Sequence, residues 1–212
     1  MSEKEVSFSF NARYYQAAEL NAETRQLWIV LHGYGQLAQY FIRKFSVLEK
    51  HQICVIAPEG LSRFYLEGFY GRVGATWMTK EDRLRDISNY IKYLNALYQE
   101  LVLLNKKLPP VTLLGFSQGS ATVTRWLMDK QVQFERLILW AGIFPPDLDF
   151  NLGSEYLANK KIQFVYGEND PFLTAEKIKE YKELCKKLNI QPELIPFTGA
   201  HDIDSETLLK LI

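Results

Sequence analysis

A serine stands at the centre of residues 115–119, which read Gly-Phe-Ser-Gln-Gly. Apolar residues 111–114 precede this motif and the amphipathic residues 118–130 follow it, so a strand is expected to pass into a helix there. In that setting a serine occupies a strained turn with an exposed hydroxyl, and the glycines let strand and helix approach closely. The motif predicts Ser117 as a nucleophile; the alternative is a tight turn in which the serine only caps the helix.

A serine hydroxyl becomes a good nucleophile only when a base takes its proton, and the chain has three histidines. His51 lies between a helical stretch and a strand, at the opposite edge of the predicted sheet. His32 follows an apolar strand but precedes the serine in the chain. His201 follows the last strand candidate. Proteins with this serine motif carry their catalytic residues in the order nucleophile, acid, histidine, and His201 agrees with that order. The order favours His201 as the base, with a buried structural histidine as the alternative.

The base in turn needs a carboxylate that fixes its tautomer and stabilises its charged form. Asp170 is the leading candidate because it directly follows an apolar strand and precedes a proline that turns the chain away. Asp147 and Asp149 follow the preceding strand and stay open as alternatives. Asp202 and Asp204 adjoin the histidine, where side chains rarely face each other, and are interpreted as caps of the last helix.

Attack on an ester carbonyl creates an oxyanion, which preorganised N–H groups must stabilise. One donor follows from the serine motif: the backbone N–H of Gln118, at the positive end of the helix that begins there. The second donor is expected from residues 32–35, His-Gly-Tyr-Gly, because their glycines permit a close approach of the backbone. A plain strand-to-helix turn is the alternative interpretation of these four residues.

Short apolar runs alternate with amphipathic stretches along the chain. The runs predict strands at residues 27–31, 53–57, 111–114, 137–141, 162–166 and 193–197. The amphipathic stretches predict helices at residues 37–50, 81–107, 118–130, 174–188 and 203–212. This alternation is typical of an α/β fold, a mostly parallel central sheet with helices on both faces. Residues 6–10 and 13–18, separated by a short turn, predict an antiparallel N-terminal hairpin at the sheet edge. The segments that carry the candidate side chains follow strand ends, where such sheets bind ligands.

The 212 residues fit a single domain, with 47% hydrophobic and 24% charged residues. Lys plus Arg and Asp plus Glu are both 25, and a net charge of zero argues against nucleic-acid binding. No apolar run reaches the length of a membrane span. The two cysteines are expected to be free thiols in a reducing compartment, and we expect a cytoplasmic protein. Neither a metal site nor a cofactor-binding motif emerges.

The motifs around Ser117, Asp170 and His201, together with Leu-His-Gly-Tyr-Gly at residues 31–35, resemble those of the phospholipase/carboxylesterase family of α/β hydrolases. This group includes acyl-protein thioesterases and small bacterial carboxylesterases, and the likeness runs from about residue 27 to the end of the chain. The resemblance implies an α/β-hydrolase fold and a catalytic triad of these three residues. It implies an oxyanion hole made by the amides of Tyr34 and Gln118. A serine hydrolase acting on a small-molecule ester or acyl thioester is the expected function.

Two departures from the family pattern leave the substrate open. Tyr34 stands where the thioesterases of the family commonly have leucine, and residues 64–80 form an aromatic-rich segment without a clear counterpart. Phe69, Tyr70 and Trp77 of that segment are candidates for the wall of an acyl pocket, with ordinary core packing as the alternative. The alternative function is a non-catalytic protein that binds a small ligand on the same fold. The oligomeric state is also open, a homodimer included.

Overall fold

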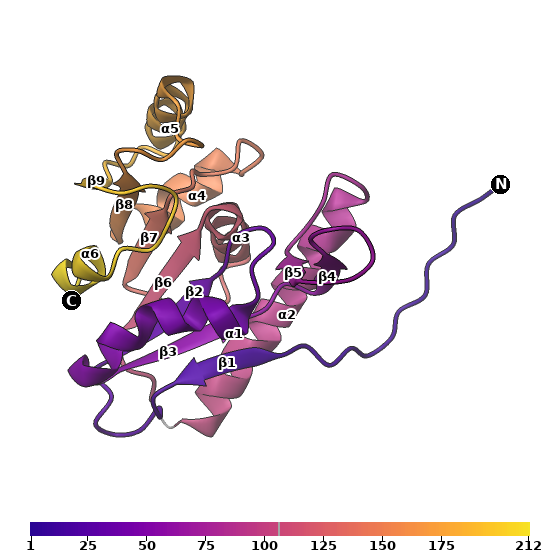
Figure 1. Ribbon diagram of the computed structural model, residues 1–212, viewed down its shortest axis with the longest axis horizontal. Coiled ribbons are helices and arrows are strands. Elements are labelled where there is room, and N and C mark those ends of the chain that lie inside the picture. Colours follow the sequence, from indigo (N-terminus) through magenta and orange to yellow (C-terminus); the bar gives the residue numbers. More distant parts are fainter. Residues whose placement is uncertain (106) are drawn as a thin grey trace.

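The computed structural model describes residues 1–105 and 107–212, and its centre is one seven-stranded sheet (Figure 1). In spatial order the strands are β1 (Tyr14–Ala17), β3 (Ile53–Pro58), β2 (Gln26–Leu31), β6 (Val111–Phe116), β7 (Arg136–Trp140), β8 (Lys161–Gly167) and β9 (Glu193–Phe197). All neighbouring strands are parallel except β1, which runs antiparallel to β3. The predicted α/β class, with a mostly parallel sheet and an antiparallel N-terminal strand at its edge, is confirmed.

The partner of that edge strand differs from the prediction. Residues 6–10 form no strand, and β1 pairs with β3, from Tyr14 opposite Pro58 to Ala17 opposite Val55. Val6 and Phe8 are 85% and 78% exposed, and the N-terminal arm leaves the body of the molecule in Figure 1. Because β1 pairs with β3, it belongs to a sheet that buries a core, whereas a strand at residues 6–10 would lie outside that sheet. Alternation of apolar and polar residues does not by itself provide a partner strand.

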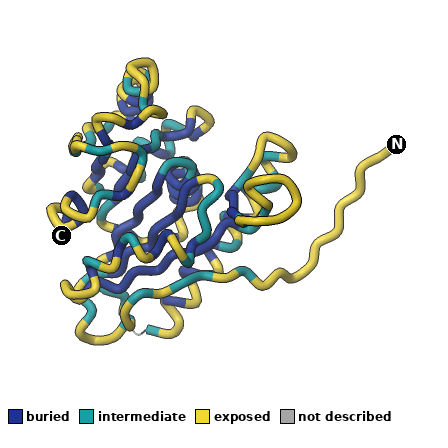
Figure 2. Tube along the Cα trace, in the orientation of Figure 1, coloured by how far each residue is buried: buried dark blue, intermediate teal, exposed yellow. Residues whose placement is uncertain are grey.

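Helices cover both faces of the sheet because its central strands are apolar on both faces. In β2, Leu27 and Ile29 contribute to one core cluster while Trp28 and Val30 contribute to the other, and all four are fully buried. The first cluster is covered by α2 (Arg83–Leu104), α3 (Gln118–Leu127), α4 (Phe150–Leu157) and α5 (Ala175–Lys187). The second is covered by α1 (Ala38–Phe41), the 3₁₀ segment η1 (Ile42–His51) and α6 (Ser205–Lys210). Figure 2 shows the buried strands between exposed loops.

The predicted helices are present with shifted ends, and one helix was missed. The stretch at residues 37–50 begins as α1 and continues as the 3₁₀ segment η1. The prediction for residues 81–107 corresponds to α2, although residue 106 lies outside the described residues. Helix α4 was not predicted; its N-cap Asp149 accepts a hydrogen bond from the backbone N–H of Leu152.

A small antiparallel hairpin, β4 (Ser62–Tyr65) and β5 (Val73–Thr76), occupies most of the aromatic-rich segment. Its tip turns at Gly68 and Gly71, whose φ angles of +61° and +93° suit glycine. The hairpin is joined to the loop that follows β2, because Gly35 N–H donates to the carbonyl of Ala75 at 2.9 Å. It therefore lies directly beside the segment predicted to supply an oxyanion donor.

Within the described part of the chain, none of the helices combines the length and the apolar character that crossing a bilayer requires.

Candidate active site

The candidate residues gather where the strand order of the sheet reverses. The chain runs from β2 outward to β3, and later from β6 outward through β7 and β8 to β9. Neighbouring strands β2 and β6 therefore mark the switch point, the usual ligand position in such sheets. His32 follows β2 and Ser117 follows β6. A Cβ placed on Gly33 would lie 3.2 Å from Cβ of Ser117, so the two loops are in direct contact.

Ser117 sits in the strained turn that its motif predicts. Its φ and ψ angles are +52° and −115°, a region that residues other than glycine rarely adopt. Its backbone N–H donates to the carbonyl of Trp140 at the end of β7, at 2.8 Å. A Cβ on Gly119 would lie 2.2 Å from the carbonyl oxygen of Leu31, so only glycine lets α3 begin against the end of β2. The predicted strand–turn–helix setting is thus present, with Ser117 between β6 and α3.

His201 and Asp170 form a hydrogen-bonded pair. The distance between Nδ1 of His201 and Oδ2 of Asp170 is 2.7 Å, and the Asp170 side chain is fully buried. The other carboxylate oxygen accepts the backbone N–H of Phe172 at 2.8 Å, which fixes the orientation of Asp170. The His201 ring packs against the rings of Phe116 and Phe172, with centroids 4.9 and 4.7 Å away. Because Phe116 precedes Ser117, the pair lies at the same sheet edge as the serine.

The alternative acids have other partners. Asp147 binds Arg83 of α2 and Arg125 of α3, with 2.7 Å between its Oδ1 and the Arg125 guanidinium. Burial alone would raise the pKa of Asp147, but the two arginines hold that pKa below its usual value. Asp149 accepts the N–H of Leu152 and caps α4. Neither has a recorded bond to His201 among the described residues.

The two acids beside His201 have different roles. Asp204 accepts the N–H of Thr207 at 2.7 Å and caps α6, as predicted. Asp202 was also interpreted as a cap, which is wrong. Its carboxylate pairs instead with Lys44 of η1 at 2.6 Å and accepts the N–H of Ile203. The cap position belongs to Asp204 because the helix starts one residue later, at Ser205.

The two remaining histidines lie in contrasting surroundings. His51 ends η1 and is exposed to solvent. His32 is fully buried, and its ring stacks on Trp77 with 5.0 Å between centroids. Burial lowers the pKa of His32 to about 4, so the ring is neutral at physiological pH. It is one residue from Gly33, which touches the candidate nucleophile.

The two amides named as oxyanion donors lie on either side of the switch point. Tyr34 follows Gly33 in the loop after β2, and Gln118 is the first residue of α3. Among residues 1–105 and 107–212, no backbone partner is recorded for either N–H. The Gln118 side chain, in contrast, makes three hydrogen bonds. It accepts from the N–H of Trp77 and the hydroxyl of Thr76, and it donates to the carbonyl of Met78.

The three aromatic residues proposed for an acyl pocket do not share one enclosed space. Phe69 and Tyr70 lie at the hairpin tip and are 91% and 81% exposed. Trp77 is 2% exposed, and its ring N–H donates to the carbonyl of His32 at 2.9 Å. Trp77 is thus part of the support beneath the loop after β2, while Phe69 and Tyr70 are free to contact other molecules.

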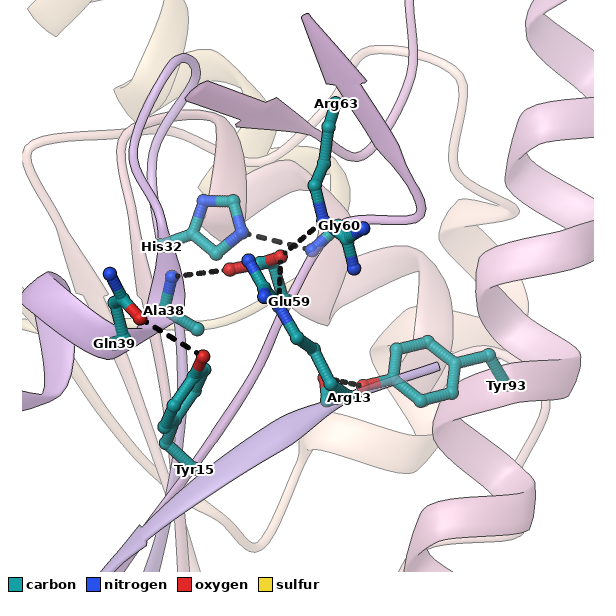
Figure 3. A network of polar contacts seen from close by, with 9 residues as sticks. All are labelled: Arg13, Tyr15, His32, Ala38, Gln39, Glu59, Gly60, Arg63 and Tyr93. Carbon is teal, nitrogen blue, oxygen red and sulfur yellow. Dashed lines mark hydrogen bonds and ion pairs between the residues drawn. The ribbon is translucent and has the colours of Figure 1, made fainter. Parts of the chain in front are cut away.

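A buried carboxylate that the sequence analysis did not single out lies beside this loop (Figure 3). Glu59, at the end of β3, is 1% exposed and accepts from Arg13 at 2.7 Å and Arg63 at 2.8 Å. Its other oxygen accepts the N–H of Ala38, at the start of α1. Burial alone would raise the pKa of Glu59, but the arginines hold it below its usual value. The position of Glu59 directly after a buried strand was the available signal.

Within the described ranges, no group of three or more His, Cys, Asp or Glu side chains is placed to hold a metal ion. Cys54 and Cys185 are free and buried, and burial raises the pKa of each thiol to about 11. Neither thiol therefore has the character of a nucleophile or a metal ligand.

Comparison with known proteins identifies the family and the fold of this chain. The sequence profile described as phospholipase/carboxylesterase matches residues 15–212. Comparison with curated protein sequences gives no match. Solved structures share the fold at low identity. Esterase PE8 has a TM-score of 0.68 at 17% identity, covering 95% of this chain and 99% of its own.

Two further structures are similar over nearly their whole length. Acyl-protein thioesterase 2 of Zea mays has a TM-score of 0.70 at 13% identity, covering 95% of this chain and 96% of its own. The Bacillus cereus carboxylesterase has a TM-score of 0.67 at 15% identity, covering 94% of this chain and 91% of its own. At these identities the structural likeness shows the fold alone, an α/β hydrolase, whereas the profile match shows the family. This chain belongs to the phospholipase/carboxylesterase family of hydrolases.

Proposed function

We propose that the protein is a serine hydrolase that cleaves carboxylic esters or thioesters through an acyl-enzyme on Ser117. The observation that carries the proposal is the 2.7 Å bond between His201 and the buried Asp170, at the same sheet edge as the strained Ser117. A buried carboxylate bound to Nδ1 keeps the proton of a neutral histidine there and leaves Nε2 as the basic nitrogen. That is the arrangement a serine nucleophile requires.

The reaction runs in two half-steps. In the first, Nε2 of His201 takes the proton of the Ser117 hydroxyl while the oxygen attacks the carbonyl carbon of the substrate. The resulting oxyanion accepts hydrogen bonds from the N–H groups of Tyr34 and Gln118. His201 then gives its proton to the departing alcohol or thiol, which leaves an acyl group on Ser117. In the second half-step, water replaces the serine as nucleophile and the same transfers release the carboxylic acid.

We propose that the substrate contacts the β4–β5 hairpin. A cavity of about 480 Å³ lies between α1 and the hairpin, and its lining includes Gly35, Phe41 and Leu66. Its size falls in the range of small-molecule sites, and it begins one residue from Tyr34. The exposed Phe69 and Tyr70 stand at the tip of the same hairpin and are proposed to contact the acyl chain. Trp77 is proposed to support the loop after β2, since its side chain is buried.

We also propose that the protein works in the cytoplasm. Both cysteines are buried free thiols, and disulfide-free cysteines are the norm in that reducing compartment.

The test is the Ser117→Ala variant. It should lower kcat for a p-nitrophenyl ester by a factor on the order of 10³–10⁶, because the members of a triad act as a unit. The melting temperature should change little, since one hydroxyl and no core volume is lost. Retained turnover in a folded Ser117→Ala protein would exclude Ser117 as the nucleophile, whereas a folded wild type without turnover would favour the non-catalytic ligand-binding alternative.

A further inference from the structure

One fully buried ionisable side chain near the candidate site has no part in the reaction described above. His32 is fully buried at the end of β2, two residues before Tyr34. Its ring nitrogens bind Gly33 and Gly60 and not Ser117, and its place before the serine in the chain does not suit a catalytic base. Burying a polar ring is costly unless its nitrogen atoms are hydrogen-bonded. The hydrogen bonds that compensate this cost show which backbone groups the His32 ring positions.

Both ring nitrogens of His32 are bound to the backbone. The N–H of Gly60 donates to Nε2 at 2.9 Å, so Nε2 carries no proton (Figure 3). In a neutral imidazole the proton must then lie on Nδ1. Nδ1 is 2.7 Å from the carbonyl oxygen of Gly33 and donates to it. The hydrogen bond from Gly60 therefore fixes the tautomer of His32. The proton that this tautomer carries on Nδ1 holds the carbonyl of the Gly33–Tyr34 peptide.

That peptide carries a candidate oxyanion donor on its other side. No peptide bond among residues 1–105 and 107–212 is cis, so the carbonyl of Gly33 and the N–H of Tyr34 point in opposite directions. Holding the carbonyl toward the buried ring directs the N–H away from it. Gly33 itself faces the nucleophile, since a Cβ at that position would lie 3.2 Å from Cβ of Ser117. A rotation of this one peptide would remove the N–H and present a carbonyl in its place.

The His32 ring is itself held by contacts that lead to Gln118, the other residue proposed to supply an oxyanion donor. Trp77 stacks on His32 and donates its ring N–H to the His32 carbonyl at 2.9 Å. The backbone N–H of Trp77 in turn donates to the side chain of Gln118 at 3.2 Å. Hydrogen bonds and one stacking contact thus connect the two residues whose amides are proposed to bind the oxyanion. A chain of this kind can keep both donors in register.

We propose that His32, as a neutral imidazole protonated on Nδ1, is a positioning residue that orients the Tyr34 N–H toward the oxyanion. The proposal rests on the proposed function, because it assigns a role in the oxyanion hole of that reaction. His32 touches neither the substrate nor the reacting atoms. It acts through the Gly33–Tyr34 peptide.

Two substitutions separate this role from ordinary core packing. In His32→Asn the side-chain amide N–H lies close to the position of Nδ1 and can still donate to the Gly33 carbonyl. In His32→Gln the amide oxygen lies close to the position of Nε2 and can still accept from Gly60, but the donor to Gly33 is lost. Both variants lose the ring and its stacking on Trp77, so their stabilities should fall by similar amounts. His51→Gln, at an exposed position far along η1, is the control histidine.

We expect different kinetics from the two variants on a p-nitrophenyl ester. His32→Gln should lower kcat by a factor of about 10²–10³ with little change in KM, the usual effect of losing one oxyanion donor. His32→Asn should stay within about tenfold of the wild type, and His51→Gln should match it. The affinity for a trifluoromethyl ketone, which forms an oxyanion on the serine, should fall in parallel with kcat. Equal kcat for the folded Asn and Gln variants would overturn the proposal.

A measurement on the unaltered protein covers the case in which the variants do not fold. Long-range ¹H–¹⁵N spectra of the histidine rings should show His32 protonated on Nδ1 alone at neutral pH. A proton on Nε2 would overturn the proposal without any substitution. Failure of the proposed function has a different signature, because the wild type would then show no turnover that depends on Ser117. If that turnover is present and the Asn and Gln variants are equal, only the role of His32 is wrong.

Discussion

Asp170 is the hydrogen-bond partner that orients the His201 ring at the edge of the sheet. Its fully buried carboxylate holds Nδ1 at 2.7 Å, while Phe116 and Phe172 pack against the ring. The two alternative acids are bound elsewhere, Asp147 to arginines and Asp149 to the start of α4, and Asp202 beside the histidine pairs with Lys44. The assignment of the acid therefore depends on one contact and can be tested at one residue.

Asp170→Asn should lower kcat by a factor of about 10⁴, because asparagine keeps the shape, removes the charge and can hold the wrong tautomer of the histidine. Asp147→Asn, Asp149→Asn and Asp202→Asn should each stay within about tenfold of the wild type, since they lose only surface pairs or a cap. All four variants are compared by kcat on one ester. A large loss in Asp147→Asn or Asp149→Asn, with near-normal kcat in Asp170→Asn, would move the acid to the loop after β7.

His32 makes the stability of the protein sensitive to acid. Burial lowers its pKa from 6.5 to about 4, so the unfolded chain binds a proton more readily than the folded one. The stability that His32 contributes as a neutral ring is full above pH 6.5 and is lost as the pH falls toward 4. Glu59 is the charged group near the ring. Its depressed pKa places its own contribution at lower pH, because that stability is lost only as the carboxylate becomes protonated.

We therefore expect the free energy of unfolding to fall by about 2 kcal/mol more in the wild type than in His32→Gln between about pH 7 and about pH 5. Urea unfolding of both proteins at the two pH values measures this difference. Identical pH dependence in the two proteins would mean that His32 is not buried in its neutral form.

The elements around the switch point fit together through glycine. Helix α3 can start against the end of β2 only because Gly119 has no side chain, since a Cβ there would meet the carbonyls of Leu31 and His32 at 2.2 and 2.9 Å. These neighbours are backbone atoms and cannot rotate away. At Gly153 in α4 the nearest neighbour is instead Cδ2 of Leu188, the movable end of a side chain, at 2.7 Å. The two glycines form a matched pair on two helices.

Gly119→Ala should lower the free energy of unfolding by about 2 kcal/mol, even though alanine favours a helix more than glycine does. It should also lower kcat by about 10–100-fold, because displacement of α3 moves the Gln118 N–H. Gly153→Ala should change stability by less than about 1 kcal/mol and leave kcat unchanged. Denaturant unfolding and kcat of both variants decide the matter; equal effects of the two substitutions would show that the contact at Gly119 does not fix the helix.

The sequence predicted the elements that are buried and missed those that depend on a partner. The central strands were predicted from continuous apolar runs, because strands covered on both faces need them. The β4–β5 hairpin was missed, since its register depends on pairing with the loop at Gly35 and Gln36. Residues 6–10 have the alternation of a strand but no neighbour to pair with, and that prediction was wrong. Helix α4 is short, and its N-cap residue Asp149 alone was not enough to predict it.

At the scale of the whole molecule, chain order carries most of the information about the site. In a sheet of this kind the loops after β2, β6, β8 and β9 open at one edge, so the order of the strands alone predicts that residues far apart in sequence lie together. The pairing of His201 with Asp170 follows from that topology. The burial of Trp77, the tautomer of His32 and the contacts of Glu59 do not, because they depend on side-chain packing across the hairpin.

The proposed reaction requires Ser117 to become covalently acylated. The most direct measurement is intact-protein mass spectrometry after reaction with a fluorophosphonate, followed by peptide mapping of the adduct. An activated serine should gain one adduct, located on Ser117, and Ser117→Ala should gain none. Asp170→Asn, which keeps the serine but weakens its base, should react far more slowly than the wild type. A folded wild-type protein that stays unlabelled, or one whose adduct maps to another residue, would show that Ser117 is not an activated nucleophile.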